Sequence, residues 1–290
     1  MFNLTKKIVM ILLFIGTFLF AENKELPKNE ISKIEQLEIF KKASIKILKA
    51  YDAGSLYILT ISVHGNKDEI YLTKDKKFII SGTVVNVSNE MQVSAPVDLS
   101  ITKDKEAFVY GNGKDEYVLF TDPECPFCKK FHSTPKELVD ASHGNINWQW
   151  MHMPLSFHEP AASSEAEAAE CIADQKGNKG FWVAASEIFA STNGNGQGVP
   201  NIMDIAGDLG VNEDQFKSCM ENGKFKTKVQ QTAQKGSSLG LNGTPAIILV
   251  DNASGKSTVL KGAQPIEAIT AAIKNLMSVS QVSTPGNTEQ

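Results

Sequence analysis

The segment Tyr117-Val-Leu-Phe-Thr-Asp-Pro-Glu-Cys125-Pro-Phe-Cys128 decides how this chain is expected to fold. Its first four residues are apolar and predict a short buried strand, after which Thr121 to Glu124 make a tight connection. Cys125-Pro126-Phe127-Cys128 then opens a helix. Two cysteines separated by two residues at a helix start lie close enough to form a small disulfide ring, so the segment indicates a redox-active dithiol.

The two cysteines are expected to differ in reactivity. Cys125 stands at the helix N-terminus, where unpaired backbone N–H groups and the helix dipole favour a negative charge. We therefore expect the pKa of its thiol to fall below the usual value of about 8.5. Cys128, one turn further along, is expected to be more buried and to act as the resolving thiol.

Charged neighbours of Cys125 would act on the pKa of its thiol in both directions. Asp122 and Glu124 would raise it, whereas Lys129 and Lys130 would lower it, and the sum of these effects stays open.

Two other uses of a Cys-x-x-Cys pair are weaker hypotheses. Such a pair is half of many zinc sites, but the remaining cysteines, Cys171 and Cys219, are single residues and supply no second pair. A purely structural disulfide in so short a ring would restrict the unfolded chain little and add little stability. We therefore expect redox chemistry, with no metal and no organic cofactor.

The start of the chain is typical of a secretory signal peptide over residues 1–21. Lys6-Lys7 precedes an apolar run from Ile8 to Phe20, and Ala21 marks the expected cleavage site. The run is shorter than the about 20 residues of a comfortable membrane span, and an uncleaved anchor is the alternative. Either way the protein would lie outside the cytosol, where disulfides persist, and we place it in a periplasm.

The charge of the chain argues against nucleic acid as a partner. The formal net charge is -4, and cleavage after residue 21 removes two lysines and leaves -6 (-4 minus 2). No basic stripe accompanies this mildly acidic balance.

Residues 22–88 predict a small α+β unit. Apolar residues recur at every third position from Ile31 to Phe40, which favours a helix to about Ala43, and Ile45 to Tyr51 begins to look like a strand. Three further segments read as successive antiparallel strands, Leu56–Val63, Glu69–Thr73 and Phe78–Val85. Because so small a unit rarely buries enough core to be strongly stable alone, pairing with a second copy would cover its edges.

The rest of the chain predicts a linker, a second domain and a tail. Residues 89–105 are polar and read as a linker, residues 106–278 form an α/β domain, and residues 279–290 are disordered by composition. The elements expected in the domain are the redox helix (125–141), a strand (146–154), helices (165–173, 181–189, 202–209 and 214–236), two strands (246–251 and 257–260) and a closing helix (266–277).

A strand, Cys-x-x-Cys and a helix, followed much later by Gly243-Thr244-Pro245 at the start of a strand, resemble the thioredoxin fold. The resemblance implies that the Thr244–Pro245 peptide bond is cis. It also implies that Thr244 and Pro245 lie against the cysteine pair and present backbone to a substrate chain.

Two segments narrow the resemblance to the DsbC/DsbG family of periplasmic thiol:disulfide interchange proteins. They are Phe120-Thr-Asp-Pro-Glu-Cys-Pro-Phe-Cys128 and Ile70-Tyr-Leu-Thr-Lys-Asp-Lys-Lys-Phe-Ile-Ile-Ser-Gly82, and the resemblance covers about residues 31–278. It implies a cystatin-like N-terminal dimerisation domain, a linker and a thioredoxin-like catalytic domain, assembled as a V-shaped homodimer. Thr244 before the proline matches the isomerase branch.

Other features depart from that family. Cys171 and Cys219 lie in a helical insertion that looks more like the domain of a DsbA-type oxidase. The Pro126-Phe127 dipeptide is unlike the Gly-Tyr of DsbC and close to the Pro-Tyr of DsbG. Leu119 occupies the position of the buried acid of thioredoxin, an absence that DsbC and DsbG share.

Cys171 and Cys219 are expected to form a structural disulfide, because an oxidising compartment rarely leaves two buried thiols unpaired. The alternative is two buried free thiols. A bridge that closes a loop of 48 positions (219 minus 171) would be worth about 3–4 kcal/mol in the chain-entropy model.

Histidines and aromatic residues add little to the functional hypothesis. His132, one turn after Cys128, would be placed to tune the Cys125 thiolate, although a plain surface histidine is the more frequent case. The large aromatic residues of the domain, Trp148, Trp150, Phe181 and Trp182, are most simply core.

The sequence therefore favours a periplasmic thiol:disulfide isomerase or reductase. It would act on unfolded or misoxidised secreted proteins and would be recharged by a membrane reductant of DsbD type. The first alternative is a dimeric DsbA-like oxidase that is recharged by a DsbB-type oxidant. The second is a holdase chaperone for which the thiols are incidental.

Overall fold

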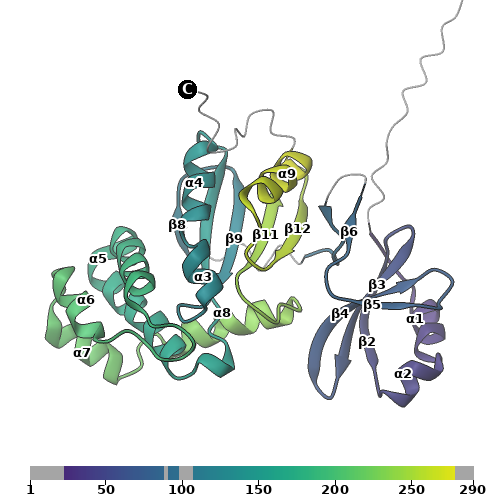
Figure 1. Cartoon of the computed structure of the whole chain (residues 1–290), viewed down its shortest axis with the longest axis horizontal. Helices are drawn as coiled ribbons and strands as arrows, with labels where there is room; N and C mark the ends of the chain where they lie inside the picture. The colour runs from purple at the N-terminus through teal and green to yellow at the C-terminus, as the bar shows by residue number, and fades with distance from the viewer. Residues whose placement is uncertain (1–22, 88–90, 98–106, 278–290) are drawn as a thin grey trace, which may run out of the picture.

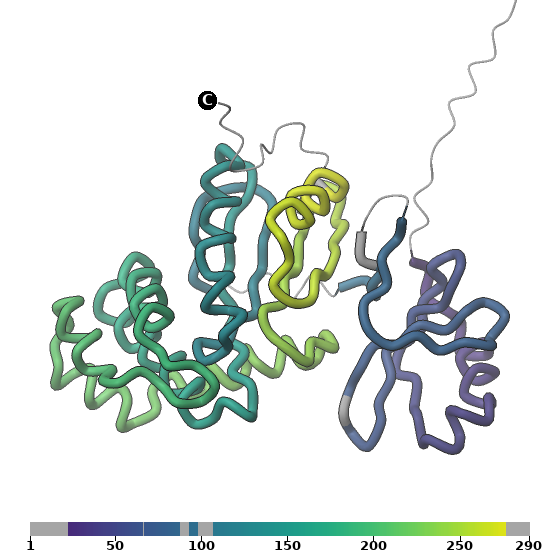
Figure 2. The backbone as a smooth tube through the Cα atoms, in the orientation of Figure 1, coloured from purple at the N-terminus to yellow at the C-terminus, as the bar shows by residue number. Residues whose placement is uncertain are grey.

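The computed structural model describes residues 23–87, 91–97 and 107–277, and Figures 1 and 2 show their arrangement. The predicted signal peptide (1–21) and the predicted tail (279–290) lie outside the described residues, as does most of the predicted linker. Among the helices that the structure describes, none is long and apolar enough to cross a membrane.

The N-terminal part of the chain is a small α+β unit, as expected. Its antiparallel sheet has the order β1-β2-β3-β4-β5, and two helices cover one face (Figure 1). Ile34 and Phe40 of these helices pack against Ile47, Leu59 and Ile61 of the strands. The elements are β1 (Lys24–Glu25), α1 (Lys28–Glu35), α2 (Glu38–Lys42), β2 (Lys46–Asp52), β3 (Leu56–Val63), β4 (Asn66–Thr73), β5 (Ile79–Ser81), β6 (Val85–Asn86) and β7 (Met91–Gln92).

Two predicted elements of this unit have different bounds. The expected helix from Ile31 to Ala43 is divided, because Leu37 has an extended conformation between α1 and α2. The expected strand from Phe78 to Val85 is interrupted at Gly82, whose φ of 99° is a left-handed conformation that glycine adopts readily and that turns the chain.

Residues 91–97, which the sequence assigns to a linker, belong to the folded N-terminal unit. The Ala95 N–H donates to the Glu69 carboxylate at 3.0 Å, and β7 pairs with β6. Strand β4, which carries Glu69, also contacts residues 107–277. Asn242 Nδ2 lies 3.4 Å from Asp68 Oδ1, and Lys261 Nζ lies 3.9 Å from Glu69 Oε1.

A mixed five-stranded sheet organises residues 107–277, in the order β12-β11-β9-β10-β8. β9 and β10 are parallel, and the other neighbouring strands are antiparallel. The helices α3, α4 and α9 lie on one face (Figure 1). These elements are β8 (Phe108–Tyr110), β9 (Asp115–Thr121), α3 (Pro126–Phe131), α4 (Ser133–Ala141), β10 (Ile146–His152), β11 (Ala246–Asp251), β12 (Lys256–Lys261) and α9 (Ile266–Met277).

The central strand β9 is buried on both faces of this sheet. Tyr117 and Leu119 belong to the core shared with α3, α4, α9 and the insertion, whereas Val118 and Phe120 pack into the core on the opposite face. A strand that is covered on both sides reads as a continuous apolar run, which is the pattern that predicted it.

A helical insertion joins β10 to β11. It consists of η2 (Ser156–His158), α5 (Ala161–Ser191), α6 (Ile202–Asp208), α7 (Glu213–Glu221) and α8 (Lys226–Ser238). The break predicted at residues 177–180 is confirmed, because Gly177 within α5 has a non-helical φ of 67° and the chain kinks there between two helical segments. The helix predicted over 214–236 is divided near Gly223, whose φ is 56°. α8 then packs against β10.

Candidate redox active site

Cys125 lies at the junction of β9 and α3, as the sequence predicts. Its N–H donates to Asp122 O at 3.1 Å, which closes the turn after the strand. Cys125 is the N-cap residue of α3, and Pro126 is the first helical residue. Proline suits this position because its φ is already helical and its missing N–H would have no partner in the helix.

The segment before β11 meets this junction. β11 runs antiparallel to β9 with Ala246 opposite Phe120, so the start of β11 lies beside the end of β9. The Cys125 Sγ lies 3.4 Å from Thr244 O. The Thr244–Pro245 peptide bond is cis, as the resemblance implies.

Cys125 and Cys128 are free thiols, and both are buried. The pKa of Cys125 is lowered to about 6, chiefly by a hydrogen bond from the Cys128 side chain. Burial opposes this lowering, and backbone N–H groups of Cys128 and Phe127 and the side chain of Thr244 assist it. The direction matches the expectation from the helix N-terminus, but the largest cause is the partner thiol.

Cys128 has the opposite character. Burial raises its pKa well above the ordinary value for a thiol, and the neighbouring Cys125 adds to the increase. Near neutral pH, Cys125 is therefore a thiolate at the helix start, and Cys128 is a buried protonated thiol that donates a hydrogen bond to it.

The two carboxylates before Cys125 are fully buried. Asp122 accepts the backbone N–H groups of Glu124 and Leu155, each at 2.8 Å, and its Oδ2 lies 2.7 Å from His158 Nδ1. Glu124 binds a different part of the insertion, the loop after α5, through Thr192 and Gly198. Neither carboxylate is among the largest causes of the shift in the Cys125 pKa.

The interpretation of His132 as a plain surface residue is wrong. The centroid of its half-buried ring lies 4.7 Å from that of Phe189, and 5.9 and 6.0 Å from those of Trp148 and Trp150. Burial lowers the pKa of His132 to about 4, so its imidazole is neutral near neutral pH. The His132 Nε2 lies 3.0 Å from Ser186 Oγ.

His132 also marks the point where the predicted redox helix divides into α3 and α4. The cause is Pro135, three residues further on. Pro135 has no backbone N–H, so it cannot donate to the carbonyl of Phe131 and the helical ladder is interrupted.

Two aromatic side chains near the dithiol are exposed. Phe127, between the cysteines, is 64% exposed, and Phe157 in η2 is 73% exposed. Phe157 stacks edge-on against His158, which binds Asp122. The sequence carries no signal that Phe157 and His158 belong to the site, because their positions depend on how the insertion returns to the strand end.

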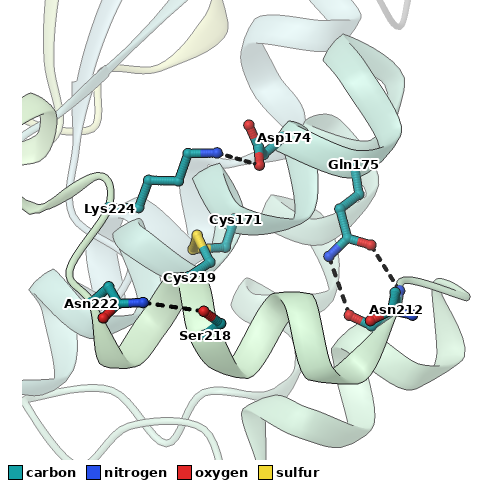
Figure 3. The surroundings of a disulfide bond; sticks show 8 residues. All are labelled: Cys171, Asp174, Gln175, Asn212, Ser218, Cys219, Asn222 and Lys224. Carbon is teal, nitrogen blue, oxygen red and sulfur yellow. Dashed lines mark hydrogen bonds and ion pairs between the residues drawn. A yellow bond between two sulfur atoms is a disulfide. The ribbon is translucent and has the colours of Figure 1, made fainter.

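Cys171 and Cys219 form the expected disulfide, which joins α5 to α7 (Figure 3). Polar contacts flank it on both sides, and Figure 3 shows them. Lys224 Nζ lies 2.6 Å from Asp174 Oδ2, and the Gln175 side chain binds the backbone of Asn212. The alternative of two free buried thiols does not hold.

His152 and His158 bind different partners. His152 Nε2 lies 3.2 Å from the buried Glu170, whereas His158 pairs with Asp122. Within residues 23–87, 91–97 and 107–277, no group of three or more His, Cys, Asp or Glu side chains is placed to hold a metal ion.

Comparisons with known proteins agree with this geometry. The sequence model of a family described as Thioredoxin matches residues 103–275. The thiol:disulfide interchange protein DsbC of Escherichia coli is 28% identical over 135 residues, which cover 44% of this chain and 53% of DsbC. DsbC of Dickeya dadantii is 25% identical over 211 residues, 70% of this chain and 71% of that protein. The crystal structure of DsbA2 of Pseudomonas aeruginosa is similar with 30% identity and a TM-score of 0.52, covering 58% of this chain and 92% of that one.

These matches differ in how much of each relative they span. A stretch of the Na⁺/H⁺ antiporter NhaA 1 of Salinispora arenicola is 27% identical over 159 residues, but they are only 22% of the antiporter. The chain thus spans about half the length of E. coli DsbC and about a fifth of the antiporter. The Dickeya DsbC alignment covers more of the chain than residues 103–275, so that similarity extends into the N-terminal part.

Proposed function

The chain belongs to the thioredoxin family, and from its active site we propose that it is a thiol:disulfide interchange protein, a disulfide isomerase or reductase of secreted proteins. The observation that carries the proposal is Cys125, whose pKa is about 6 and whose sulfur lies 3.4 Å from Thr244 O. A thiolate is the attacking form in disulfide exchange, and a neighbouring main-chain carbonyl provides a place for an extended substrate strand.

The reaction begins with the Cys125 thiolate. It attacks one sulfur of a substrate disulfide, so that the substrate S–S bond breaks, a mixed disulfide forms and one substrate thiolate leaves. In isomerisation, a substrate thiolate attacks the mixed disulfide and releases Cys125 unchanged. In reduction, Cys128 loses its proton and attacks Cys125 Sγ, which leaves a Cys125–Cys128 disulfide and a substrate dithiol.

The substrates, partners and location follow the same proposal. Unfolded or misoxidised proteins of a periplasm supply non-native disulfides, and a membrane reductant returns the two electrons to the Cys125–Cys128 disulfide after each reduction. The names of the DsbC relatives support exchange chemistry. No cofactor takes part, because the electrons move between sulfur atoms.

We also propose a homodimer through the N-terminal unit. β5 lies at the edge of its sheet, and all three of its residues are exposed. Phe78, which precedes it, is 64% exposed. An exposed apolar edge strand is a template for pairing with another chain, and a second copy would cover it. Sedimentation of residues 22–290 as a monomer at micromolar concentration would refute the dimer.

Reactivation of ribonuclease with scrambled disulfides tests the main proposal. The wild type is expected to restore ribonuclease activity, C125S to be inactive, and C128S to retain part of the isomerisation because the substrate thiol can still release Cys125. A C125S/C128S double variant that works as well as the wild type would contradict exchange chemistry and support a holdase.

A disulfide oxidase is the second candidate, and the 30% identity to P. aeruginosa DsbA2 favours it. A stabilised thiolate also makes the corresponding disulfide a stronger oxidant, because it favours the reduced form. The reduction potential of the Cys125–Cys128 pair separates the two functions. A value near about -120 mV would indicate an oxidase, whereas a value near about -200 mV permits shuffling.

A further inference from the structure

The loop between α5 and α6, Thr192–Gly198, lies against the segment that carries Cys125, and we call it the glycine loop. The Asn195 N–H donates to Glu124 O at 2.7 Å. A Cβ atom at Gly194 would lie 3.5 Å from Glu124 O and 3.7 Å from Pro126 Cγ. The loop therefore contacts both residues that flank Cys125, while Thr244 contacts its sulfur.

The fully buried carboxylate of Glu124 holds this loop at both ends. Thr192 Oγ1 donates to one carboxylate oxygen, and the Gly198 N–H donates to the other at 2.9 Å. The Thr192 hydroxyl also accepts the Gly194 N–H at 3.0 Å, so one acidic side chain organises the whole turn. Hydrogen bonds to a buried charged group are about twice as strong as those between neutral groups.

Two further residues fix the same loop. Glu165 of α5 accepts the Val199 N–H at 2.7 Å, just after the loop. Lys129 of α3 donates to Thr192 O at 2.9 Å and to Ala190 O at 3.2 Å, where α5 ends. The dithiol segment and the insertion are therefore joined by bonds from Glu124 and Lys129, one on each side of the cysteine pair.

The glycines let the loop approach this closely. Gly194, Gly196 and Gly198 all have positive φ, and a Cβ atom at Gly196 would lie only 3.2 Å from His158 Cα. The residues that alternate with these glycines are exposed, namely Asn193, Asn195 and Gln197. The loop thus presents a polar outer rim and a main chain that fits tightly against the active site.

We infer that Glu124 is a specificity-determining positioning residue, which holds the glycine loop as a rigid wall beside Cys125 and so limits the bulk of the group that reaches the Cys125 sulfur. The inference rests on the proposed function, in which Cys125 is the attacking thiol. It assigns to the helical insertion a role in substrate selection. A substrate strand would enter between the glycine loop and Thr244.

Alkylation of the reduced full-length protein tests this inference with two reagents that share one reactive group. N-ethylmaleimide is small, and a maleimide joined to a long polyethylene glycol chain is bulky. Peptide mass spectrometry identifies the labelled cysteine. We expect E124A to raise the ratio of the two alkylation rate constants at Cys125, bulky over small, by about tenfold or more. The loss of a buried hydrogen bond to a charged group shifts the equilibrium from the closed to the open loop by at least that factor.

Conservative variants separate loop anchoring from general damage. E124Q keeps an acceptor for Gly198 N and a group that can pair with the Thr192 hydroxyl, so its ratio is expected to stay within about twofold of the wild type. T192V removes only the hydroxyl and is expected to raise the ratio, whereas T192S should restore it. T192V also serves if E124A does not fold.

Two results would overturn the inference in distinguishable ways. Equal ratios for wild type, T192V and a folded E124A would show that the loop does not restrict access, with Cys125 still the attacking thiol. Wild-type protein in which Cys128 reacts as fast as Cys125 would overturn the proposed function, and the inference with it.

Discussion

The Cys125 Sγ and the Thr244 carbonyl oxygen lie 3.4 Å apart, although 119 positions separate them in the sequence. The antiparallel register of β9 and β11 produces this proximity, because Ala246 lies opposite Phe120. The contact places a reactive sulfur beside a main-chain acceptor. A disulfide-containing strand bound along residues 244–245 would therefore present its sulfur to the thiolate.

Replacing Cys128 with alanine is expected to raise the pKa of Cys125. The hydrogen bond from the Cys128 thiol is the largest cause of the lowering to about 6. Its loss should shift the pKa upward by roughly one unit or more. The ultraviolet absorbance of the thiolate, recorded against pH, measures the change directly, since Cys125 is then the free thiol at the site. In C128S, which keeps a hydroxyl donor, the Cys125 pKa should lie between the values of the wild type and C128A. An unchanged Cys125 pKa in C128A would show that the Cys128 thiol does not cause the lowering.

Replacing Thr244 with valine is expected to have a smaller effect in the same direction. The Thr244 side chain lowers the pKa of both thiols through a hydrogen bond to sulfur. T244V should raise the Cys125 pKa by roughly half a unit. T244S is the matched control and should behave as the wild type. A larger pKa shift in T244V than in C128A would contradict the assignment of the Cys128 thiol as the main cause of the lowered Cys125 pKa.

Removal of the insertion disulfide should cost stability without changing the thiolate. The C171A/C219A double variant is expected to lose about 3–4 kcal/mol of unfolding free energy, because the bridge closes a long loop. Denaturant titration under oxidising conditions measures the loss. The pKa of Cys125 in the same variant is the control and should stay near 6. A loss below about 1 kcal/mol would mean that the bridge restricts the unfolded chain little.

The buried glutamates Glu124 and Glu165 make the stability of the protein depend on pH. Burial and the negative charge of Glu124 raise the pKa of Glu165 to about 8. The folded protein therefore holds a proton that the unfolded chain releases above about pH 4.5, so this contribution to stability falls as pH rises to about 8.

The E165Q variant lacks this titration. The unfolding free energy of the wild type minus that of E165Q should fall between pH 5 and 8, by at most about 1.4 kcal/mol per pH unit and by less where solvent screens the pair. Thermal or denaturant unfolding at several pH values tests the sign. A difference that rises with pH would contradict the assigned protonation.

The local sequence around the dithiol predicts much of the site. The apolar run before Cys125 and the proline after it identify the strand end and the helix start, and the resemblance supplies the approach of Thr244. The direction of the Cys125 pKa shift also follows from the helix N-terminus. Its largest cause was missed, because it depends on the orientation of the Cys128 thiol, which sequence spacing leaves open.

Features that depend on distant packing could not be predicted. His132 is half-buried only because β10 and α5 bring Trp148, Trp150 and Phe189 around it. Glu124 resembles an ordinary surface acid in the sequence, and its burial depends on Thr192, which lies 68 positions away.

The redox state of Cys125 and Cys128 in intact cells tests the central claim most directly. Free thiols are alkylated at the moment of lysis, and the reduced fraction is read from the shift in mass. An isomerase or reductase must keep its attacking thiolate, so the account predicts that the pair is mostly reduced. A pair that is mostly oxidised at steady state would contradict the isomerase or reductase function and identify the protein as a disulfide oxidase.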